Sequence, residues 1–120
     1  MIFDTNVLIY LSNSTLPLSK LFTTEGQISV ISKIEALGYA FKSPDEHFFL
    51  VELCNELPVI ALSDLIAEQT IIIRKNHKIK LPDAIIYSTA LVQNLPLLTN
   101  NIADFKYLGN KVELINPFDL

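Results

Sequence analysis

Four acidic residues of this chain stand at positions where their carboxylates could act together. Asp4 follows the apolar residues 1–3, and Glu35 lies in the first turn after a second predicted strand. Asp83 opens a predicted helix, and Asp104 follows a fourth short apolar stretch. Carboxylates at close range raise one another's pKa unless a cation is bound. Hard oxygen ligands at that density favour Mg²⁺ or Mn²⁺ over zinc.

Each of these acids also has a purely structural interpretation. Asp4 can cap the helix that follows it, and Glu35 can complete a capping box with Ser32, three residues before it. Asp83 can complement the dipole of its helix. Asp104 can be an ordinary loop or capping residue. Taken one at a time, the acids do not separate a chemical role from a structural one.

The order of the predicted elements decides where the acids meet. Short apolar strands alternate with helical patterns, which predicts a three-layer α/β/α fold around a mainly parallel sheet of four to five strands. Parallel strands end at one edge, where ligands bind in the crevice beyond the strand ends, so we expect the four carboxylates to converge there. Strands are predicted at residues 1–3, 27–31, 58–62, 96–99 and 111–115, with helices over about 7–11, 33–41, 43–56, from 63 onward, and 83–94.

Helix starts are predicted from capping residues. Thr5 or Asn6 is the expected cap of the first helix, and Ser32 that of the second. Ser43, followed by Pro44, is expected to begin the third. The core-facing side of the second helix is expected to comprise Ile34, Leu37 and Phe41, and that of the third Phe48, Phe49, Val51, Leu53 and Leu57.

Length and composition favour a single domain, residues 1–120, with one core. Half of the residues are hydrophobic and the mean hydropathy is +0.37, yet no apolar run approaches the roughly 20 residues of a membrane span. Buried strands account for much of this composition, and we expect a dimer interface or a partner to cover the rest of the apolar surface. The single cysteine, Cys54, is expected to be a buried small hydrophobe. With no disulfide possible within the chain and no secretory signal, a cytoplasmic location is expected.

Four segments carry a resemblance to a known family. In chain order, they resemble the motifs of PIN domains, and specifically of the VapC-type ribonuclease toxins of toxin–antitoxin pairs. The segments are Asp4-Thr5-Asn6-Val7-Leu8, Ser29-Val30-Ile31-Ser32-Lys33-Ile34-Glu35, Leu81-Pro82-Asp83-Ala84-Ile85-Ile86 and Leu98-Thr99-Asn100-Asn101-Ile102-Ala103-Asp104-Phe105. Together they span nearly the whole chain.

The resemblance implies a set of site residues. It makes Asp4 and Asp83 the principal ligands of Mg²⁺ or Mn²⁺, with Glu35 completing the acidic pocket. The family pattern near the fourth strand often reads Thr-x-Asp-x-x-Asp-Phe, and here Asn101 occupies the earlier acidic place. Whether Asn101 or Asp104 lies nearer the metal therefore stays open.

The resemblance also implies supporting residues and an activity. Thr99 matches the family's hydroxyl residue at the end of the fourth strand, and Thr5 or Asn6 is expected to orient Asp4 or a metal-bound water. The implied activity is metal-assisted hydrolysis of RNA phosphodiester bonds by an endoribonuclease. The implied partners are a protein antitoxin and a second copy of the chain in a homodimer.

Few basic residues are available to hold RNA phosphates. The net charge is −4, which argues against a broad basic surface but not against a nuclease, because bound cations invert the local field. The densest group, Arg74, Lys75, Lys78 and Lys80, precedes Asp83 and could line the route to the pocket, although a solvated helix end is an equal interpretation. His77 is expected to be a surface histidine. Further candidates are Lys33, Lys106 and Lys111.

Other functions have weaker support from the residues. A phosphoacceptor receiver domain has an acidic pair after its first strand and an aspartate at the end of its third. Here Asp4 stands alone, and Asp64 begins a helix. A haloacid-dehalogenase-type phosphatase would need a second aspartate where Asn6 stands. A PIN-like binding or interaction module, its pocket weakened by Asn101, remains open. Metal titration followed by an RNA cleavage assay separates that module from an enzyme.

Overall fold

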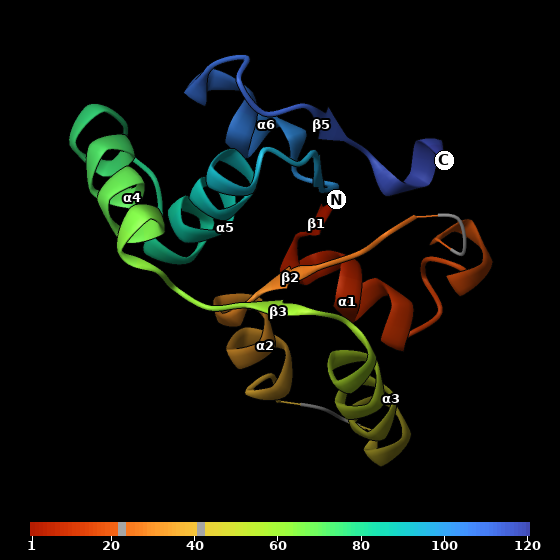
Figure 1. Ribbon diagram of the computed structural model, residues 1–120. Coiled ribbons are helices and arrows are strands. Elements are labelled where there is room, and N and C mark those ends of the chain that lie inside the picture. Colours follow the sequence, from red (N-terminus) through yellow and green to blue (C-terminus); the bar gives the residue numbers. More distant parts are fainter. Residues whose placement is uncertain (22–23, 41–42) are drawn as a thin grey trace.

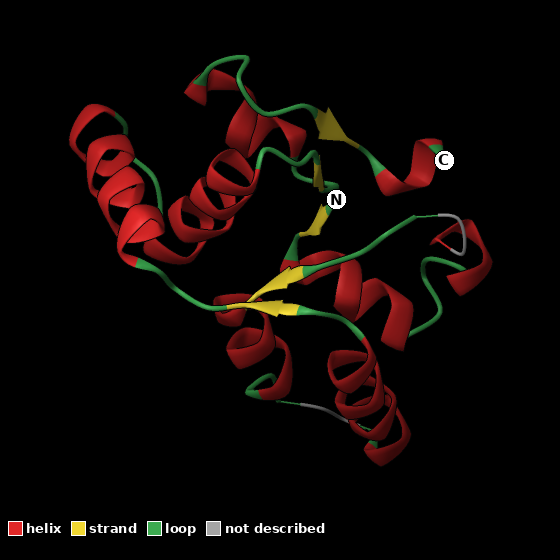
Figure 2. Cartoon of the chain, viewed as in Figure 1, coloured by secondary structure: helices red, strands yellow, loops and turns green. Residues whose placement is uncertain are grey.

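The computed structural model describes residues 1–21, 24–40 and 43–120. Across these residues, five two-residue strands run parallel to one another (Figures 1 and 2): β1 Ile2–Phe3, β2 Ile28–Ser29, β3 Val59–Ile60, β4 Leu97–Leu98 and β5 Leu114–Ile115. The strand order is β1-β4-β5 in one part of the sheet and β2-β3 in the other. A parallel bridge between Ile2 and Gln27 joins the two parts beside β1. The continuous order is therefore β3-β2-β1-β4-β5, with β1 at its centre.

Helices cover both faces of this sheet (Figure 1). They are α1 Thr5–Ser12, α2 Val30–Leu37, α3 Pro44–Glu56, α4 Asp64–Asn76, α5 Leu81–Gln93 and α6 Ile102–Phe105, with 3₁₀ turns η1 Leu18–Leu21, η2 Lys106–Leu108 and η3 Pro117–Asp119. Among the described residues, no helix is long and apolar enough to cross a bilayer. The predicted three-layer α/β/α class is confirmed.

Alternation along the strands divides the core between the two faces. Phe3 and Leu98 pack with α1 and α3, whereas the preceding residues, Ile2 and Leu97, pack with α5 and α6. Successive strand residues point to opposite faces, so β1, β4 and β5 each contribute one residue to either core. These three strands are therefore apolar on both sides, and the polar residues Asp4 and Thr99 follow β1 and β4 at the sheet edge.

The second strand-to-helix junction differs from the prediction. The helix begins at Val30, and its cap is Ser29, whose hydroxyl accepts a hydrogen bond from the Ile31 N–H at 3.2 Å. The prediction of a strand to Ile31 and a cap at Ser32 is therefore wrong. Pairing with β3 ends at Ser29, so Val30 and Ile31 have no ladder to continue. The helix ends at Leu37, short of the predicted end at residue 41, which lies outside the described residues.

The third helix has the predicted bounds, and its predicted core-facing side is confirmed in part, because Phe49, Leu53 and Leu57 pack half-buried against the core. Ser43 caps α3 by accepting a hydrogen bond from the Glu46 N–H at 3.4 Å, as its sequence predicts. Leu50 and Cys54, four residues apart, are the buried residues of this helix, which confirms the prediction for Cys54. Phe48 was expected in the core but is 67% exposed. Phe48 lies two positions from Leu50, so it points well away from the buried stripe.

Candidate active site

The four acids lie at the carboxyl edge of the sheet, on elements that meet around β1. Asp4 follows β1 directly, Glu35 lies on α2, Asp83 lies in the first turn of α5, and Asp104 lies on α6, which follows β4. Their charges act on one another. Asp83 and Glu35 both raise the pKa of Asp4, and Glu35 and Asp104 raise that of Asp83. The structure thus brings all four predicted carboxylates into one electrostatic group.

Asp4 is the buried member of the group. Its side chain is 4% exposed and accepts two hydrogen bonds, from the Thr5 N–H to Oδ1 and from the Thr99 hydroxyl to Oδ2, both at 2.8 Å. Burial raises its pKa to about 6, the Thr99 hydrogen bond opposes that rise, and the charge of Asp83 adds to it. Asp4 is also the N-cap of α1, so the expectation that Thr5 or Asn6 is the cap is wrong. Asp4 therefore caps α1 and is at the same time the buried carboxylate of the acidic group.

Glu35 is held by a pair of hydroxyl groups. The Thr5 Oγ1 lies 2.8 Å from the Glu35 Oε1 and 3.0 Å from the Ser32 Oγ. A threonine hydroxyl has one proton, and the carboxylate can only accept. The hydrogen bonds therefore run from Ser32 to Thr5 and from Thr5 to Glu35. The capping-box interpretation of Glu35 is wrong, because Ser32 lies inside α2 and both residues bond across to α1.

Thr99 connects the first acid to the loop after β4. Its buried hydroxyl donates to Asp4 and accepts a hydrogen bond from the Asn101 N–H at 3.0 Å. Asn101 therefore supports the site through its backbone. Its side chain makes no capping hydrogen bond to α6. Asn6, half-buried on α1, makes no side-chain hydrogen bond with the described part of the chain.

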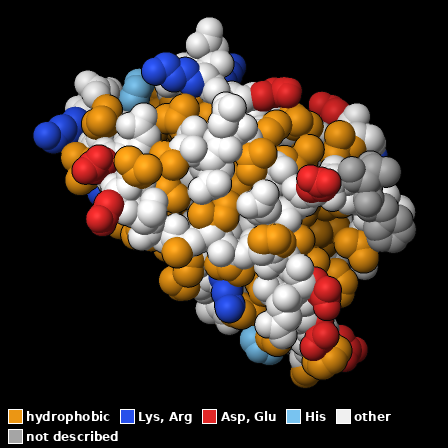
Figure 3. Space-filling model, in the orientation of Figure 1, with side chains coloured by type: hydrophobic (Ala, Val, Ile, Leu, Met, Phe, Trp, Pro, Cys, Tyr) orange, Lys and Arg blue, Asp and Glu red, His pale blue; other side chains and the backbone are white. Residues whose placement is uncertain are grey.

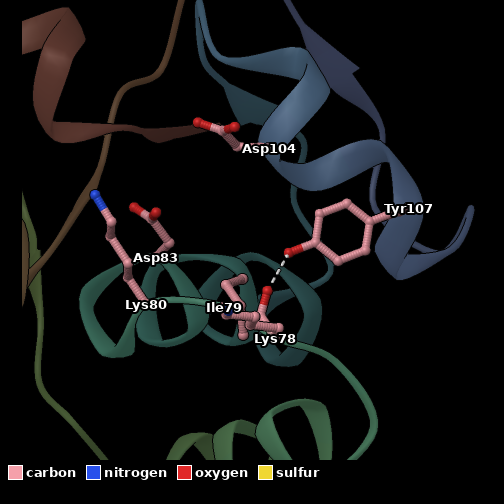
Figure 4. A pocket seen from close by; sticks show the side chains of 6 residues that line it. All are labelled: Lys78, Ile79, Lys80, Asp83, Asp104 and Tyr107. Atoms are coloured by element: carbon pink, nitrogen blue, oxygen red, sulfur yellow. Dashed lines mark hydrogen bonds between the residues drawn. The ribbon is translucent and has the colours of Figure 1, made fainter.

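A pocket of about 230 Å³ opens beside the outer two acids (Figure 4). The carboxylates of Asp83 and Asp104 face the space between α5 and α6, and the Lys80 ammonium lies beside Asp83. Burial raises the pKa of Asp83, Glu35 and Asp104 raise it further, and Lys80 lowers it. The lining residues are Lys78, Ile79, Lys80, Asp83, Asp104 and Tyr107. Of the two candidates for completing the site, Asp104 lines this pocket and Asn101 does not.

The donor set fits a hard divalent cation in its chemistry. All four side chains offer carboxylate oxygens, and the neighbouring acids raise the pKa of Asp4 and of Asp83, which reflects negative charge that a cation would neutralise. Within the described residues, no three His, Cys, Asp or Glu side chains are already close enough to hold an ion. Mg²⁺ usually binds through one or two carboxylates and keeps several waters, so a pair of acids meets its requirement.

The basic segment before α5 lies only partly at the pocket. Lys78 and Lys80 line it, and Arg74 lies along the adjoining hollow with both lysines. Arg74 also lines a second hollow, together with Lys75, Thr70 and Leu81. Of the four predicted basic residues, Lys78 and Lys80 therefore line the acidic pocket, Arg74 lies beside them, and Lys75 does not line the pocket.

Sequence reasoning missed Tyr107, which contributes an exposed aromatic ring to the pocket. No motif of the sequence singles it out. Its nearness to Asp104 in the sequence is the one available signal, but its contact with Lys78, nearly thirty positions earlier in the chain, is seen only in the folded arrangement.

Comparisons with known proteins agree with this architecture. The family model for the PIN domain matches residues 1–111. A toxin–antitoxin complex from Klebsiella pneumoniae contains a chain that is 30% identical, with a TM-score of 0.76, and the match covers 97% of this chain and 96% of that one. No curated protein matches the sequence.

Two further solved structures are similar. VapBC2 from Rickettsia felis, bound to a DNA fragment from its promoter, is 26% identical with a TM-score of 0.78, over 97% of this chain and 98% of that one. DNA-bound VapBC from Salmonella typhimurium is 21% identical with a TM-score of 0.81, over 97% and 96%, and shares the fold. Because the family model spans nearly the whole chain and the Klebsiella structure aligns along it, this chain belongs to the PIN domain family, and it resembles the VapC toxins, which are nucleases.

Proposed function

We propose that this chain is a Mg²⁺- or Mn²⁺-dependent endoribonuclease and the toxin of a toxin–antitoxin pair. The observation that carries the proposal is the coupled acidic group at the sheet edge, in which Asp4 is buried and its pKa is raised to about 6. Clustered groups with perturbed pKa values beside a pocket are typical of catalytic sites. Membership of the PIN family removes the receiver and phosphatase alternatives.

Asp4 and Asp83 are the residues that would hold the ion, with Glu35 and Asp104 adding negative charge around it. Each Asp4 oxygen accepts one hydrogen bond, and a carboxylate oxygen has a further lone pair for a ligand. Bound there, the ion would supply positive charge that polarises the scissile phosphate. The Thr99 and Thr5 hydrogen bonds fix Asp4, so the ligand is oriented before any ion binds.

The remaining residues act on the substrate and on the water. Lys78 and Lys80 line the pocket beside the acids, where their ammonium groups can hold the flanking phosphates of an RNA strand. Glu35, whose carboxylate is held by Thr5, would accept a proton from the attacking water. Because the net charge of the chain is −4, binding of RNA would depend on these few lysines near the acids and not on a general basic surface.

The proposed partners follow from the relatives and from the surface. The similar solved structures are toxin–antitoxin and VapBC assemblies, which supports a protein antitoxin as partner. Figure 3 shows hydrophobic side chains gathered over the middle of one face, and Leu65, Ile71 and Ile72 of α4 are each more than half exposed. Exposed apolar surface of this kind is typical of an interaction site, so the proposal includes a homodimer. It also includes a cytoplasmic location.

An RNA cleavage assay tests this function. The purified chain should cleave single-stranded RNA with Mg²⁺ or Mn²⁺, and EDTA should stop the reaction. Asp4→Asn and Asp83→Asn should each lower the rate at least about 100-fold, since each removes a ligand charge. Asp4→Asn should still fold, because asparagine can keep both hydrogen bonds if the Thr99 hydroxyl turns.

Asp64→Asn is the matched control, because Asp64 also opens a helix but is exposed on α4 and belongs to no acidic group. It should leave the rate unchanged. Full cleavage by folded Asp4→Asn protein would contradict the enzyme proposal. Metal binding by the wild type without any cleavage would instead support a binding module.

A further inference from the structure

Tyr107 is an exposed aromatic residue beside the acidic pocket. It lies in η2, one turn beyond Asp104, and 47% of its side chain is exposed. The pocket that it lines also holds Asp83 and Asp104 (Figure 4). Burial in the core therefore does not account for a large ring at this position.

The ring is held in place from the opposite wall of the pocket. Its hydroxyl donates a hydrogen bond to the Lys78 carbonyl at 3.0 Å, shown as the dashed line in Figure 4. The His77 ring packs against it, with centroids 5.6 Å apart and planes at 64°. A ring already fixed in this way loses little conformational entropy when a ligand packs on it.

The groups around the ring match those that bind single-stranded nucleic acid. Such sites combine cations along the phosphate backbone with aromatic rings on which bases stack. Lys78 and Lys80 supply the cations, and in the proposed nuclease the reacting phosphate would bind at the carboxylates. Within this pocket's lining, Tyr107 is the one aromatic residue that can supply the stacking surface.

We propose that Tyr107 is a stacking platform for one nucleobase of single-stranded RNA, next to the phosphate that is cleaved. This inference rests on the proposed nuclease function and adds a base-binding site to it. The ring, and not the hydroxyl, is the part that contacts the base. A tyrosine that only closed the pocket wall would depend on its hydroxyl bond to Lys78.

RNA binding with and without bases tests the proposal. The probes are a fluorescein-labelled single-stranded oligouridine of about ten nucleotides and the same chain with abasic sites, with binding followed by anisotropy in EDTA so that cleavage cannot occur. The wild type should bind the complete RNA more tightly. Tyr107→Leu should weaken binding of the complete RNA about tenfold and leave the abasic chain unchanged, because one stacked base contributes about 1–3 kcal/mol.

Three further variants separate the contribution of the Tyr107 ring to RNA binding from the contributions of its hydroxyl and of the nearby lysine. Tyr107→Phe keeps the ring and should bind within about twofold of the wild type. Lys80→Gln should weaken both probes alike, since it removes a phosphate contact. Phe48→Leu, at a ring 67% exposed on α3, is the matched control and should change neither probe.

The outcomes separate this inference from the nuclease proposal. Equal binding of the two probes by the wild type, or equal loss for both probes in Tyr107→Leu, would overturn the stacking role even if the chain cleaves RNA. A Tyr107→Phe variant as weak as Tyr107→Leu would also overturn it. Should Tyr107→Leu fail to fold, Tyr107→Trp decides the matter, because a larger ring should widen the preference for complete RNA. The nuclease proposal fails separately, through the Asp4→Asn cleavage assay.

Discussion

The two halves of the acidic group are built differently. The inner pair, Asp4 and Glu35, is held by hydroxyl and amide donors, with each hydrogen bond at 2.8 Å. The outer pair, Asp83 and Asp104, faces the pocket and makes no side-chain hydrogen bond to the described residues. The inner pair is therefore fixed before any ligand arrives, whereas the outer pair remains free to adjust to one.

The choice of donors in the inner half has an electrostatic consequence. Thr5 and Thr99 stabilise the carboxylates without adding positive charge. A lysine or arginine in their place would form an ion pair and cancel the negative potential that attracts a cation. Lys80, the cation that acts on Asp83, stands in the outer half. The inner half therefore has no positive charge among the described residues that acts on Asp4, whereas the outer half combines Asp83 and Asp104 with Lys78 and Lys80.

The largest expected difference between the halves is the pH dependence of stability due to Asp4. Burial is the main cause that raises its pKa from 3.8 to about 6. The folded protein therefore binds this proton more tightly than the unfolded chain. The stabilisation is fully present below pH 3.8 and is lost as the pH rises through about 6. It amounts to at most about 3 kcal/mol.

Urea unfolding of metal-free wild type and Asp4→Asn between pH 4 and 7 measures this effect. The free energy of unfolding of the wild type, minus that of the variant, should decrease as the pH rises. Other titrating groups are common to both proteins and largely cancel in the difference. A difference that is constant with pH would show that Asp4 is not a strained, buried carboxylate.

A smaller effect is expected from the hydroxyl groups that hold Glu35. Thr5→Val and Ser32→Ala should lower the affinity for Mn²⁺ about tenfold, because they release Glu35 from its place beside the ion, and residues that position groups around a metal typically contribute 10–100-fold. Thr5→Ser should restore the affinity, since it keeps the donor. Calorimetric titration with Mn²⁺ measures these affinities.

Ser88→Ala is a close control for Ser32→Ala. Both serines are fully buried on helices, but the Ser88 hydroxyl has no hydrogen-bond partner among the described residues. Removing it should leave the Mn²⁺ affinity unchanged. If both serine variants lost Mn²⁺ affinity equally, the hydrogen-bond chain to Glu35 would have no specific role.

The smallest expected effect distinguishes Asp104 from Asn101. Asp104 lines the pocket and acts on Asp83, whereas Asn101 contributes its backbone N–H. Asp104→Asn should lower the cleavage rate several-fold, through loss of an exposed charge at the site. Asn101→Ala keeps the backbone bond and should change the rate less than about twofold. Steady-state cleavage rates measure both effects. A larger loss of rate in Asn101→Ala than in Asp104→Asn would show that Asn101, and not Asp104, completes the site.

The sequence predicted the position of Asp4 and Asp83 because strand ends and helix starts have local signals. An apolar strand followed by Asp-Thr-Asn indicates an edge, and Leu-Pro-Asp indicates a first helical turn. These signals, together with the alternation of elements, also predicted the parallel sheet and the covering of both its faces. The segments that contain Asp4 and Asp83 also resemble motifs of PIN domains, and the match to the PIN domain family model confirms this resemblance.

The errors at the start of α2 and at Tyr107 arise because these side chains form hydrogen bonds with residues that are distant in the sequence. Ser29 and Ser32 are equally suitable caps by residue type, and Ser32 with Glu35 matches a capping box. In the fold, Ser32 and Glu35 instead form hydrogen bonds with Thr5 on α1, which lies 27 and 30 positions earlier in the sequence. Tyr107 was missed for the same reason, because its bond to Lys78 depends on how the loop between α4 and α5 lies against η2.

The most direct test of the central claim is a calorimetric Mn²⁺ titration of the wild type, Asp83→Asn and Asp64→Asn. We predict saturable binding by the wild type and by Asp64→Asn, and a loss of at least about tenfold in affinity for Asp83→Asn. Equal affinity in all three proteins, or no saturable binding by the wild type, would contradict the claim that the coupled carboxylates form a divalent-metal site.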